Sequence, residues 1–473
     1  MHKEFSVTFD QSIRQTLSNH LIREDREEDL CFALWNPSSG SKRFTALLLE
    51  VVLPEPGDRQ RHGNVSFNPQ YFERVCRLAL EKDAGIAFMH SHPGSGWQDM
   101  SKDDIAAEQR LAGPVLGLTD QPLVGLTVGN DDVWSARLWH STGDRNYKRS
   151  WCRSVRSIGE RLDVTFADFM VPRPRYGEMF KRTVAVWGEQ NHAKLARLRI
   201  GIVGLGSVGS FIAETLARSG FENIVLIDFD EIQEHNLDRL VIGTRDDIGK
   251  LKVEVAKERM SKVSTAHSMN IEAIPYSVAE EKGYFAALDC DVLFSCVDRP
   301  RARQILNHFA YAHLIPVIDG GIAVRFKNGQ FSGVDWQLQT VGPGRPCLEC
   351  LGCFSVGDVS IEIAGKLDDP SYLKGLGADH HLKRNENIFA FSENLASLEF
   401  FQLISLATSL GGFSDFGIQR FRYIPGIIDS IEANSCRLEC HVQQLLATGD
   451  RHFTLMGQDL TANAARVRQQ GQR

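Results

Sequence analysis

Three side chains that favour zinc lie close together in the first quarter of the sequence: His90, His92 and Asp104. The apolar run 84–89 leads into His90, and alternate residues of a strand point to the same side, so both imidazoles can face one ion. Ser101 precedes Asp104 by three residues and indicates the first turn of a helix. Three protein ligands leave the fourth tetrahedral position to water, which is typical of a catalytic rather than a structural zinc site. The pattern therefore predicts a zinc hydrolase.

The order His-x-His-Pro followed by Ser-x-x-Asp resembles the JAMM (JAB/MPN) metalloprotease family, which cleaves isopeptide or C-terminal peptide bonds beside ubiquitin-like proteins. The gap before Ser101 is one residue longer than the family's usual gap. The resemblance implies a glutamate that shuttles protons, for which Glu28 matches best, while Glu27 and Glu50 stay open. It also implies that Ser101 hydrogen-bonds the developing oxyanion.

A second candidate site begins where the apolar run 200–203 meets a turn containing Gly204, Gly206 and Gly209. Glycines permit a tight turn and a close backbone approach to phosphates, whose charge the following helix N-terminus favours. A second apolar run ends in Asp228, where a carboxylate can hydrogen-bond a ribose hydroxyl. On their own these residues fit a nicotinamide dehydrogenase as well as an ATP-dependent enzyme.

Charged residues downstream of this loop separate the two alternatives. The segments Asp-Phe-Asp 228–230, His-Asn-Leu-Asp-Arg 235–239 and Gly-Lys-Leu-Lys-Val-Glu 249–254 resemble the ThiF/MoeB/ubiquitin-activating superfamily, as do Cys-Val-Asp 296–298 and the stretch 175–190. Hydride transfer needs none of these cations. Adenylation needs them, because a carboxylate attacks an α-phosphate while the charge of pyrophosphate is neutralised.

The superfamily resemblance implies a role for each of these side chains. Arg239 and Lys252 would hold the triphosphate, Asp298 would bind Mg²⁺, and Arg182 would act as an arginine finger, often supplied by a facing subunit. We therefore expect a homodimer whose substrate is the C-terminal glycine of a ubiquitin-like protein. Asp238 departs from the family, in which many members have a polar uncharged residue there. The implied site for ATP and Mg²⁺ comprises Gly204, Gly206, Gly209, Asp228, Asp230, Asn236, Arg239, Lys252 and Asp298.

The cysteines in the last third of the chain have two candidate roles. The superfamily resemblance implies a structural Zn²⁺ held by the pairs Cys347/Cys350 and Cys436/Cys440, although helical spacing of the second pair fits buried core thiols equally well. Cys353 is a candidate nucleophile for a thioester with the carrier, because no other cysteine lies between it and Cys436. It is also a candidate spare zinc ligand or an inert side chain.

Composition restricts the class of protein. With 473 residues we expect two or three domains, and 42% hydrophobic and 24% charged residues are typical of a soluble globular protein. A net charge of -7 argues against general nucleic-acid binding, which relies on clustered Lys and Arg. We also expect no membrane segment, since no run approaches the roughly 20 apolar residues that span a bilayer. The first residues lack the apolar core of a signal peptide, so we expect a cytoplasmic protein.

The predicted fold class is α/β with two domains. We expect a JAMM-type zinc metalloprotease domain at 1–145, a connector at 146–175 and a polar tail at 457–473. Between them, at 176–456, we expect a Rossmann-like doubly wound domain of the ThiF/ubiquitin-activating type with a zinc knuckle. His380 and His381 indicate a solvated loop.

Together the two chemistries resemble JAMM–adenylyltransferase fusions of bacterial ubiquitin-like conjugation operons, some of them associated with phage defence. The resemblance implies a bifunctional enzyme that processes or deconjugates a ubiquitin-like protein and activates its C-terminal glycine, with a conjugating enzyme as a further partner. The alternative is activation of a sulfur-carrier protein for thiamin, molybdopterin or cysteine biosynthesis.

Overall fold

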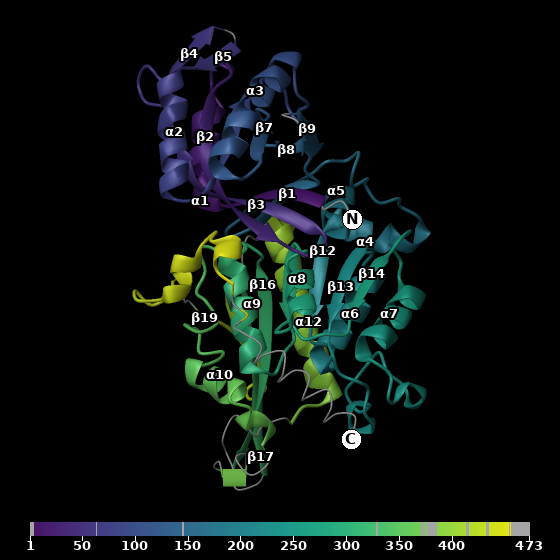
Figure 1. The fold of residues 1–473 in the computed structure, drawn as a ribbon. Coiled ribbons are helices and arrows are strands. Elements are labelled where there is room, and N and C mark those ends of the chain that lie inside the picture. Colours follow the sequence, from purple (N-terminus) through teal and green to yellow (C-terminus); the bar gives the residue numbers. More distant parts are fainter. Residues whose placement is uncertain are drawn as a thin grey trace. The chain divides into compact units, whose positions relative to one another are not determined.

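A computed structural model describes residues 4–62, 64–143, 146–327, 330–369, 374–375, 386–412, 416–431, 435–453 and 455. The chain divides into two compact units (Figure 1). The N-terminal unit comprises Met1–Pro172 with the short segments Ala312–Leu314 and Leu445–His452, and the C-terminal unit comprises the remainder. The predicted tail at 457–473 and the loop histidines 380 and 381 lie outside the described residues.

The N-terminal unit is built on a nine-stranded mixed sheet with the strand order β11-β10-β1-β3-β2-β6-β7-β8-β9, and β4 and β5 form a separate hairpin. Its elements in chain order are β1 (Glu4–Asp10), α1 (Gln11–Leu21), β2 (Leu30–Ser39), β3 (Arg43–Val52), β4 (Arg59–His62), β5 (Asn64–Phe67), α2 (Pro69–Glu81), β6 (Gly85–Ser91), α3 (Lys102–Thr119), β7 (Leu123–Val128), β8 (Trp134–Gly143), β9 (Asn146–Trp151), β10 (Ser154–Ile158) and β11 (Leu162–Phe166).

Helices cover both faces of this sheet, and the central strand β2 supplies side chains to both cores. Its odd-numbered residues, such as Cys31 and Ala33, pack with Leu17 of α1. Its even-numbered residues, such as Phe32, pack with Val75 of α2. Because side chains alternate along a strand, an apolar run without polar interruptions is what a strand buried on both faces requires.

The segment 146–175, for which the sequence predicted a connector, differs from that expectation. Most of it forms the strands β9, β10 and β11 of the N-terminal sheet, and β10 pairs in parallel with β1 through Ser154–Ile158. Charged and aromatic residues suggested a linker, but these residues lie in strands that range from the partly exposed β9 to the fully buried β10. The segment Leu445–His452 also belongs to this unit, where Asn36 Nδ2 donates a 2.9 Å hydrogen bond to the Ala447 carbonyl.

The C-terminal unit contains an eight-stranded sheet with the order β14-β13-β12-β15-β16-β17-β18-β19. Its regular elements are α4 (Lys181–Trp187), α5 (Glu189–Arg197), β12 (Arg199–Val203), α6 (Ser207–Arg218), β13 (Asn223–Ile227), α7 (Lys252–Val263), β14 (Asn270–Ile274), α8 (Glu281–Ala287), β15 (Val292–Ser295), α9 (Pro300–Ala312), β16 (Val317–Lys327), β17 (Gln330–Val341), α10 (Val356–Ile363), α12 (Phe389–Ala407), β18 (Ile418–Arg422) and β19 (Ile427–Ile431). Short 3-10 turns lie at Glu178–Phe180, Glu234–Asn236, Arg245–Asp247, Lys366–Asp368, Leu410–Gly412, His441–Leu445 and, in the N-terminal unit, Gly449–Arg451.

Strands β14 to β16 pair in parallel, whereas β16 to β19 pair antiparallel. The parallel half is the doubly wound arrangement that the sequence predicted, with connections through helices. The long apolar helix α12 begins at Phe389 and packs on β16, β17 and α6. This order places the loops at the carboxyl ends of β12, β13 and β15 at one edge of the sheet, where ligands bind in open α/β sheets.

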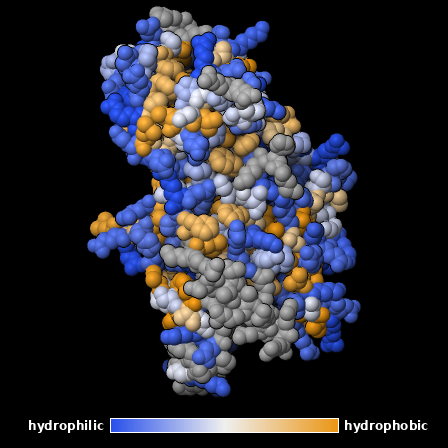
Figure 2. Space-filling view, in the orientation of Figure 1, coloured by the Kyte–Doolittle hydropathy of each residue, from blue (hydrophilic) through white to orange (hydrophobic). Residues whose placement is uncertain are grey.

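The face drawn in Figure 2 is largely hydrophilic, with apolar side chains in separate patches. Among the helices of the described residues, none combines the length and the apolar character that crossing a membrane requires.

Candidate functional sites

Side chains of His90, His92 and Asp104 converge in the N-terminal unit. The two Nε2 atoms lie 3.2 Å apart, and the Asp104 carboxylate oxygens lie 3.4 Å from His90 Nε2 and 3.3 Å from His92 Nε2. Four ligands placed tetrahedrally around zinc at its usual bond length are about 3.3 Å from one another. The three donor atoms therefore already have the separations that one zinc ion requires, and the donor set fits zinc chemistry.

Strand pairing and one helix cap produce this convergence. His90 lies near the end of β6 on the same face as Phe88, which packs towards α2 and α3. Asp104 lies in the first turn of α3, where its Oδ2 accepts a hydrogen bond of 2.7 Å from the Ser101 N–H. Ser101 Oγ accepts a bond of 3.1 Å from the Asp104 N–H, so the capping box fixes the carboxylate in front of the imidazoles.

Both His92 and Asp104 of the triad have shifted pKa values. Burial by itself would raise the pKa of Asp104, but hydrogen bonds from His90 and His92 outweigh it and lower that pKa. The hydrogen bond to Asp104 is the largest influence on His92 and raises its pKa. The aspartate is therefore a carboxylate, the form that binds a cation.

The longer loop between His92 and Ser101 does not displace the ligands. The N–H of Gly96, a residue with a φ of 78°, donates to both carboxylate oxygens of Asp131 at 2.9 Å. Asn130 Nδ2 donates to the Pro93 carbonyl at 2.7 Å. Hydrogen bonds to Asn130 and Asp131, in the turn after β7, thus hold the longer loop in place.

Of the three candidate glutamates, Glu28 is the one beside the triad. Burial raises its pKa, and the charges of His92, His90 and Asp104 act on it next. Glu27 is exposed, and Glu50 lies on β3, where it forms an ion pair with Lys82. A half-buried carboxyl with a raised pKa can accept and return a proton near neutral pH more readily than an exposed one.

Sequence reasoning missed a buried network behind the triad. Arg137 and Glu108 form an ion pair in which both side chains are fully buried, and Arg137 Nε donates to Glu108 Oε2 at 3.0 Å. Arg137 Nη1 donates to Thr127 Oγ1 at 2.6 Å, and Thr127 Oγ1 lies 3.4 Å from His90 Nε2. An arginine inside the otherwise apolar strand Trp134–Trp139 was the signal, because buried charges occur in pairs.

The glycine loop of the C-terminal unit has the predicted geometry. Gly204 has a φ of 90°, and a Cβ at this residue would lie 2.4 Å from the Cys296 carbonyl oxygen. A Cβ at Gly209 would lie 1.9 Å from the Gly204 carbonyl oxygen. Gly206 is the N-cap of α6 and has open space around its Cα. These constraints require glycine at 204 and 209, while Gly206 leaves room for a ligand.

Four charged residues gather beside this loop: Asp228, Asp230, Lys252 and Asp298. Asp228 Oδ2 accepts a 2.5 Å hydrogen bond from the Leu205 N–H, and Lys252 Nζ lies 2.7 Å from Asp230 Oδ2. Burial would lower the pKa of Lys252, but Asp228, Asp230 and Asp298 together raise it. Burial raises the pKa of Asp228. The lysine is thus a buried cation beside the loop.

Arg239 and Asn236 lie on the next turn. Arg239 Nη1 donates to the His235 carbonyl at 2.6 Å and to Asp238 Oδ1 at 2.8 Å. Asn236 Oδ1 accepts from the Gln233 N–H at 3.1 Å. Asp238, the departure from the family pattern, is therefore a local partner of the arginine.

Arg182 lies on α4 and is exposed. The hydrogen bonds and ion pairs found among the described residues do not connect it to the glycine loop.

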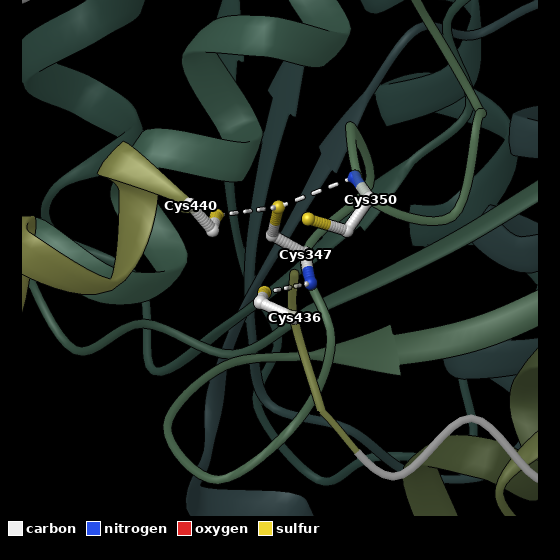
Figure 3. A group of neighbouring side chains, drawn as sticks. All are labelled: Cys347, Cys350, Cys436 and Cys440. Carbon is white, nitrogen blue, oxygen red and sulfur yellow. Dashed lines mark hydrogen bonds between the residues drawn. The ribbon is translucent and has the colours of Figure 1, made fainter. Parts of the chain in front are cut away.

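The four cysteines 347, 350, 436 and 440 converge within the C-terminal unit, as Figure 3 shows. The Sγ atoms of Cys347 and Cys440 lie 3.7 Å apart, close to the separation of about 3.8 Å expected for thiolates around one zinc ion. The Cys347 N–H donates to Cys436 Sγ at 3.1 Å, and the Cys350 N–H donates to Cys347 Sγ at 3.4 Å. Four sulfur donors in this arrangement fit a closed structural zinc site.

Cys353 is half-buried and lies three residues after Cys350 in the sequence. Burial, followed by the charge of Asp319, raises the pKa of its thiol to about 12. A thiol in this state is a poor nucleophile at neutral pH, because the thiolate is the reactive form. Gln339 Nε2 lies 3.4 Å from its sulfur.

Comparison with known proteins gives an independent result for the C-terminal unit. Residues 180–364 match the model of the ThiF family. Molybdopterin-synthase adenylyltransferase of Escherichia coli is 30% identical over 155 residues, which cover 32% of this chain and 58% of that protein.

Two further relatives match over similar lengths. Adenylyltransferase and sulfurtransferase UBA4 of Meyerozyma guilliermondii is 28% identical over 37% of this chain and 39% of its own. Ubiquitin-like modifier-activating enzyme 5 of Drosophila virilis is 27% identical over 41% of this chain and 49% of its own. The chain thus spans roughly two fifths to three fifths of the length of these relatives.

The matched range begins just before α4 and ends just after α10, so it contains the glycine loop and the charged residues beside it. The geometry of the glycine loop agrees with the match to the ThiF family model. Residues 180–364 therefore form an adenylyltransferase-type domain of the ThiF family.

Proposed function

We propose that the C-terminal unit uses ATP and Mg²⁺ to adenylate the C-terminal glycine of a ubiquitin-like protein. The observation that carries the proposal is the buried Lys252 beside the glycine loop, within the part of the chain that matches the ThiF family. Relatives named as activating enzymes or adenylyltransferases support the same chemistry.

In this reaction an oxygen of the carrier's C-terminal carboxylate attacks the α-phosphorus of ATP. The bond between the α-phosphorus and the bridging oxygen breaks, and pyrophosphate leaves with the electron pair. Lys252 and Arg239 would neutralise the departing charge, Asp298 would hold Mg²⁺, and backbone N–H groups at the N-terminus of α6, beside Gly206, would donate hydrogen bonds to the phosphates. Arg182 would complete the site from a second subunit, and the proposal therefore includes a homodimer.

Magnesium-dependent exchange of labelled pyrophosphate into ATP, with candidate carriers ending in glycine, tests this activity. Exchange should require both the carrier and Mg²⁺. ATP that binds without exchange for every carrier, including carriers encoded beside the gene, would count against adenylation.

We further propose that the N-terminal unit is a JAMM-type zinc isopeptidase. The observation that carries it is the separation of 3.2–3.4 Å between the donor atoms of His90, His92 and Asp104. Zinc held there would lower the pKa of a bound water and polarise a carbonyl. Glu28 would move the proton from that water to the leaving amine, and the Ser101 hydroxyl would donate to the oxyanion.

Cleavage of a carrier extended at its C-terminus, or linked to a lysine, tests this second activity. The expected result is cleavage after the terminal glycine, loss of activity with a chelator and recovery with Zn²⁺. Cleavage that persists in fully zinc-depleted protein would refute the assignment.

The cysteines contribute two further proposals. Cys347, Cys350, Cys436 and Cys440 would hold a structural zinc, and intact protein should then contain two zinc ions per chain. Cys353 is the candidate for a thioester with the carrier, to be passed on to a conjugating enzyme, although its raised pKa means that a conformational change must first expose it.

The alternative function is activation of a sulfur carrier, in which the adenylate is converted to a thiocarboxylate. Two of the relatives are named as a molybdopterin-synthase adenylyltransferase and as a sulfurtransferase, which favours this alternative. Mass spectrometry of the carrier separates the two. A gain of sulfur at its terminus indicates sulfur transfer, whereas a thiol-labile adduct with Cys353 or with a conjugating enzyme indicates ubiquitin-like conjugation.

A further inference from the structure

Arg303, in the first turns of α9, takes no part in the chemistry proposed above, yet it holds three separate segments. Its Nε donates to Asp319 Oδ1 at 2.9 Å. Its Nη2 donates to the carbonyls of Val297 and Gly320, each at 3.2 Å. Its Nη1 donates to the Cys353 carbonyl at 3.3 Å. One guanidinium thus joins the loop after β15 and the first residues of β16 to the segment that follows Cys350.

Asp319 completes the connection from the acidic side. Its Oδ1 also accepts a bond of 2.6 Å from Ser295 Oγ, and its Oδ2 accepts a bond of 2.9 Å from Gln339 Nε2. The same Gln339 amide lies 3.4 Å from Cys353 Sγ. Cys353 is therefore held at its carbonyl by the arginine and at its thiol by a residue bonded to the arginine's counter-ion.

Arg303 is the cation that balances the charge of Asp319. Glu399 on α12 is fully buried, and neither of its carboxyl oxygens has a hydrogen-bond partner among the described residues. Burial raises the pKa of Glu399 well above its usual value, and Asp319 adds to the effect. Glu399 thus makes no hydrogen bond to Arg303 or Asp319.

The contact with Val297 connects this group to the nucleotide site, because Asp298 is the next residue. Asp298 contributes to the pKa of both Lys252 and Arg303, so its carboxylate lies within electrostatic reach of each. A shift of Asp298 towards a bound cation would pull on the Val297 carbonyl and hence on the guanidinium. The planar fork of arginine transmits such a shift to several acceptors at once, which a lysine ammonium does not.

We propose that Arg303 is a positioning residue that couples the nucleotide site at Asp298 to the exposure of Cys353. Binding of ATP and Mg²⁺ changes the pull on the Val297 carbonyl, and the Cys353 segment responds through the same guanidinium. The inference rests on the proposed nucleotide site. It adds a route by which adenylation is signalled to the thiol.

The test is the rate at which iodoacetamide alkylates Cys353 in the full-length protein, measured site by site by mass spectrometry with and without ATP and Mg²⁺. In the unsubstituted protein the nucleotide should change this rate by about fivefold or more, the lower end of ordinary allosteric coupling. In Arg303→Lys the rate without nucleotide should rise, because the Cys353 carbonyl loses its donor, and the nucleotide effect should disappear.

Two further variants serve as controls for the result with Arg303→Lys. Arg303→Met removes the charge as well as the fork and should expose Cys353 still more, while Arg303→Lys keeps a partner for Asp319 if the methionine variant fails to fold. Arg325→Met removes an exposed arginine that pairs with Asp335 in the same unit, and it should leave both the rate and its response to ATP unchanged.

A normal ATP response at Cys353 in Arg303→Lys would overturn the proposal, as would bound ATP that leaves Cys353 unaffected in the unsubstituted protein. Equilibrium dialysis with ATP separates this failure from that of the proposed function. If no ATP binds, adenylation is refuted, and the alkylation rates without nucleotide still decide whether Arg303 holds Cys353: equal rates in the unsubstituted and Arg303→Lys proteins reject it.

Discussion

The two candidate centres differ in how far they are assembled before any ligand binds. In the N-terminal unit three donor atoms already stand at separations suited to one metal ion. In the C-terminal unit the cations have protein partners: Lys252 pairs with Asp230, and Arg239 pairs with Asp238.

This difference shows two ways in which a fold prepares a charged site. The proposed metal centre is preorganised, so binding needs little rearrangement and the loss of one ligand removes a geometry that nothing else replaces. The proposed nucleotide site contains ion pairs that would have to change partners, so ATP would compete with Asp230 and Asp238 for Lys252 and Arg239. Substitutions should therefore act steeply on the first centre and in graded steps on the second.

The largest effect should follow from His90→Ala combined with His92→Ala. Carrier cleavage should fall by at least about a thousandfold, since no metal remains to activate water. Metal analysis should show the loss of one zinc ion per chain while pyrophosphate exchange persists. Unchanged zinc content with unchanged cleavage would remove the basis for a preorganised metal centre.

A somewhat smaller loss should follow from Arg239→Ala combined with Lys252→Ala. Pyrophosphate exchange should fall by about a hundred- to a thousandfold, the usual cost of removing groups that stabilise developing charge. Carrier cleavage is the internal control and should not change. Exchange at the original rate would show that these cations do not serve the nucleotide.

The buried network behind the metal centre offers a comparison within one unit. Arg137→Met leaves Glu108 buried without its partner and should destabilise the N-terminal unit by about 3–5 kcal/mol, measured by denaturant unfolding. The double variant Arg137→Met with Glu108→Leu should recover part of that loss, because no charge is left unpaired. A double variant as unstable as the single one would show that the pair is not the source of the effect.

The smallest effect should come from Asp238→Asn, which releases Arg239 from an exposed ion pair. The KM for ATP should fall by less than about fivefold, since such pairs contribute 0–1 kcal/mol. The control variant is Asp335→Asn, which releases Arg325 from a similar exposed ion pair away from the glycine loop. A rise in KM would mean that Asp238 assists the nucleotide site and does not compete with ATP for Arg239.

Local patterns predicted the parts of these sites that depend on neighbouring residues. Alternation along β6 and the Ser101 cap position the candidate metal ligands, and the tight turn after β12 requires glycine at 204 and 209. Element types followed from the same periodicities, and the doubly wound order β14 to β16 agrees with the expectation. The extent of the N-terminal sheet did not, since β10 pairs with β1, a strand remote in sequence, and brings β11 into the same sheet.

Sequence alone identified the candidate side chains for zinc and for phosphate, because residue type and short spacing are local properties. Only the tertiary structure decided which of three glutamates lies beside the candidate zinc ligands, since Glu28 reaches them through the pairing of β2 with β6. It also revealed the pairs Glu108 with Arg137 and Asp319 with Arg303, whose members lie on different elements, 29 and 16 residues apart. Burial makes such charges meet, and burial is a property of the folded chain as a whole.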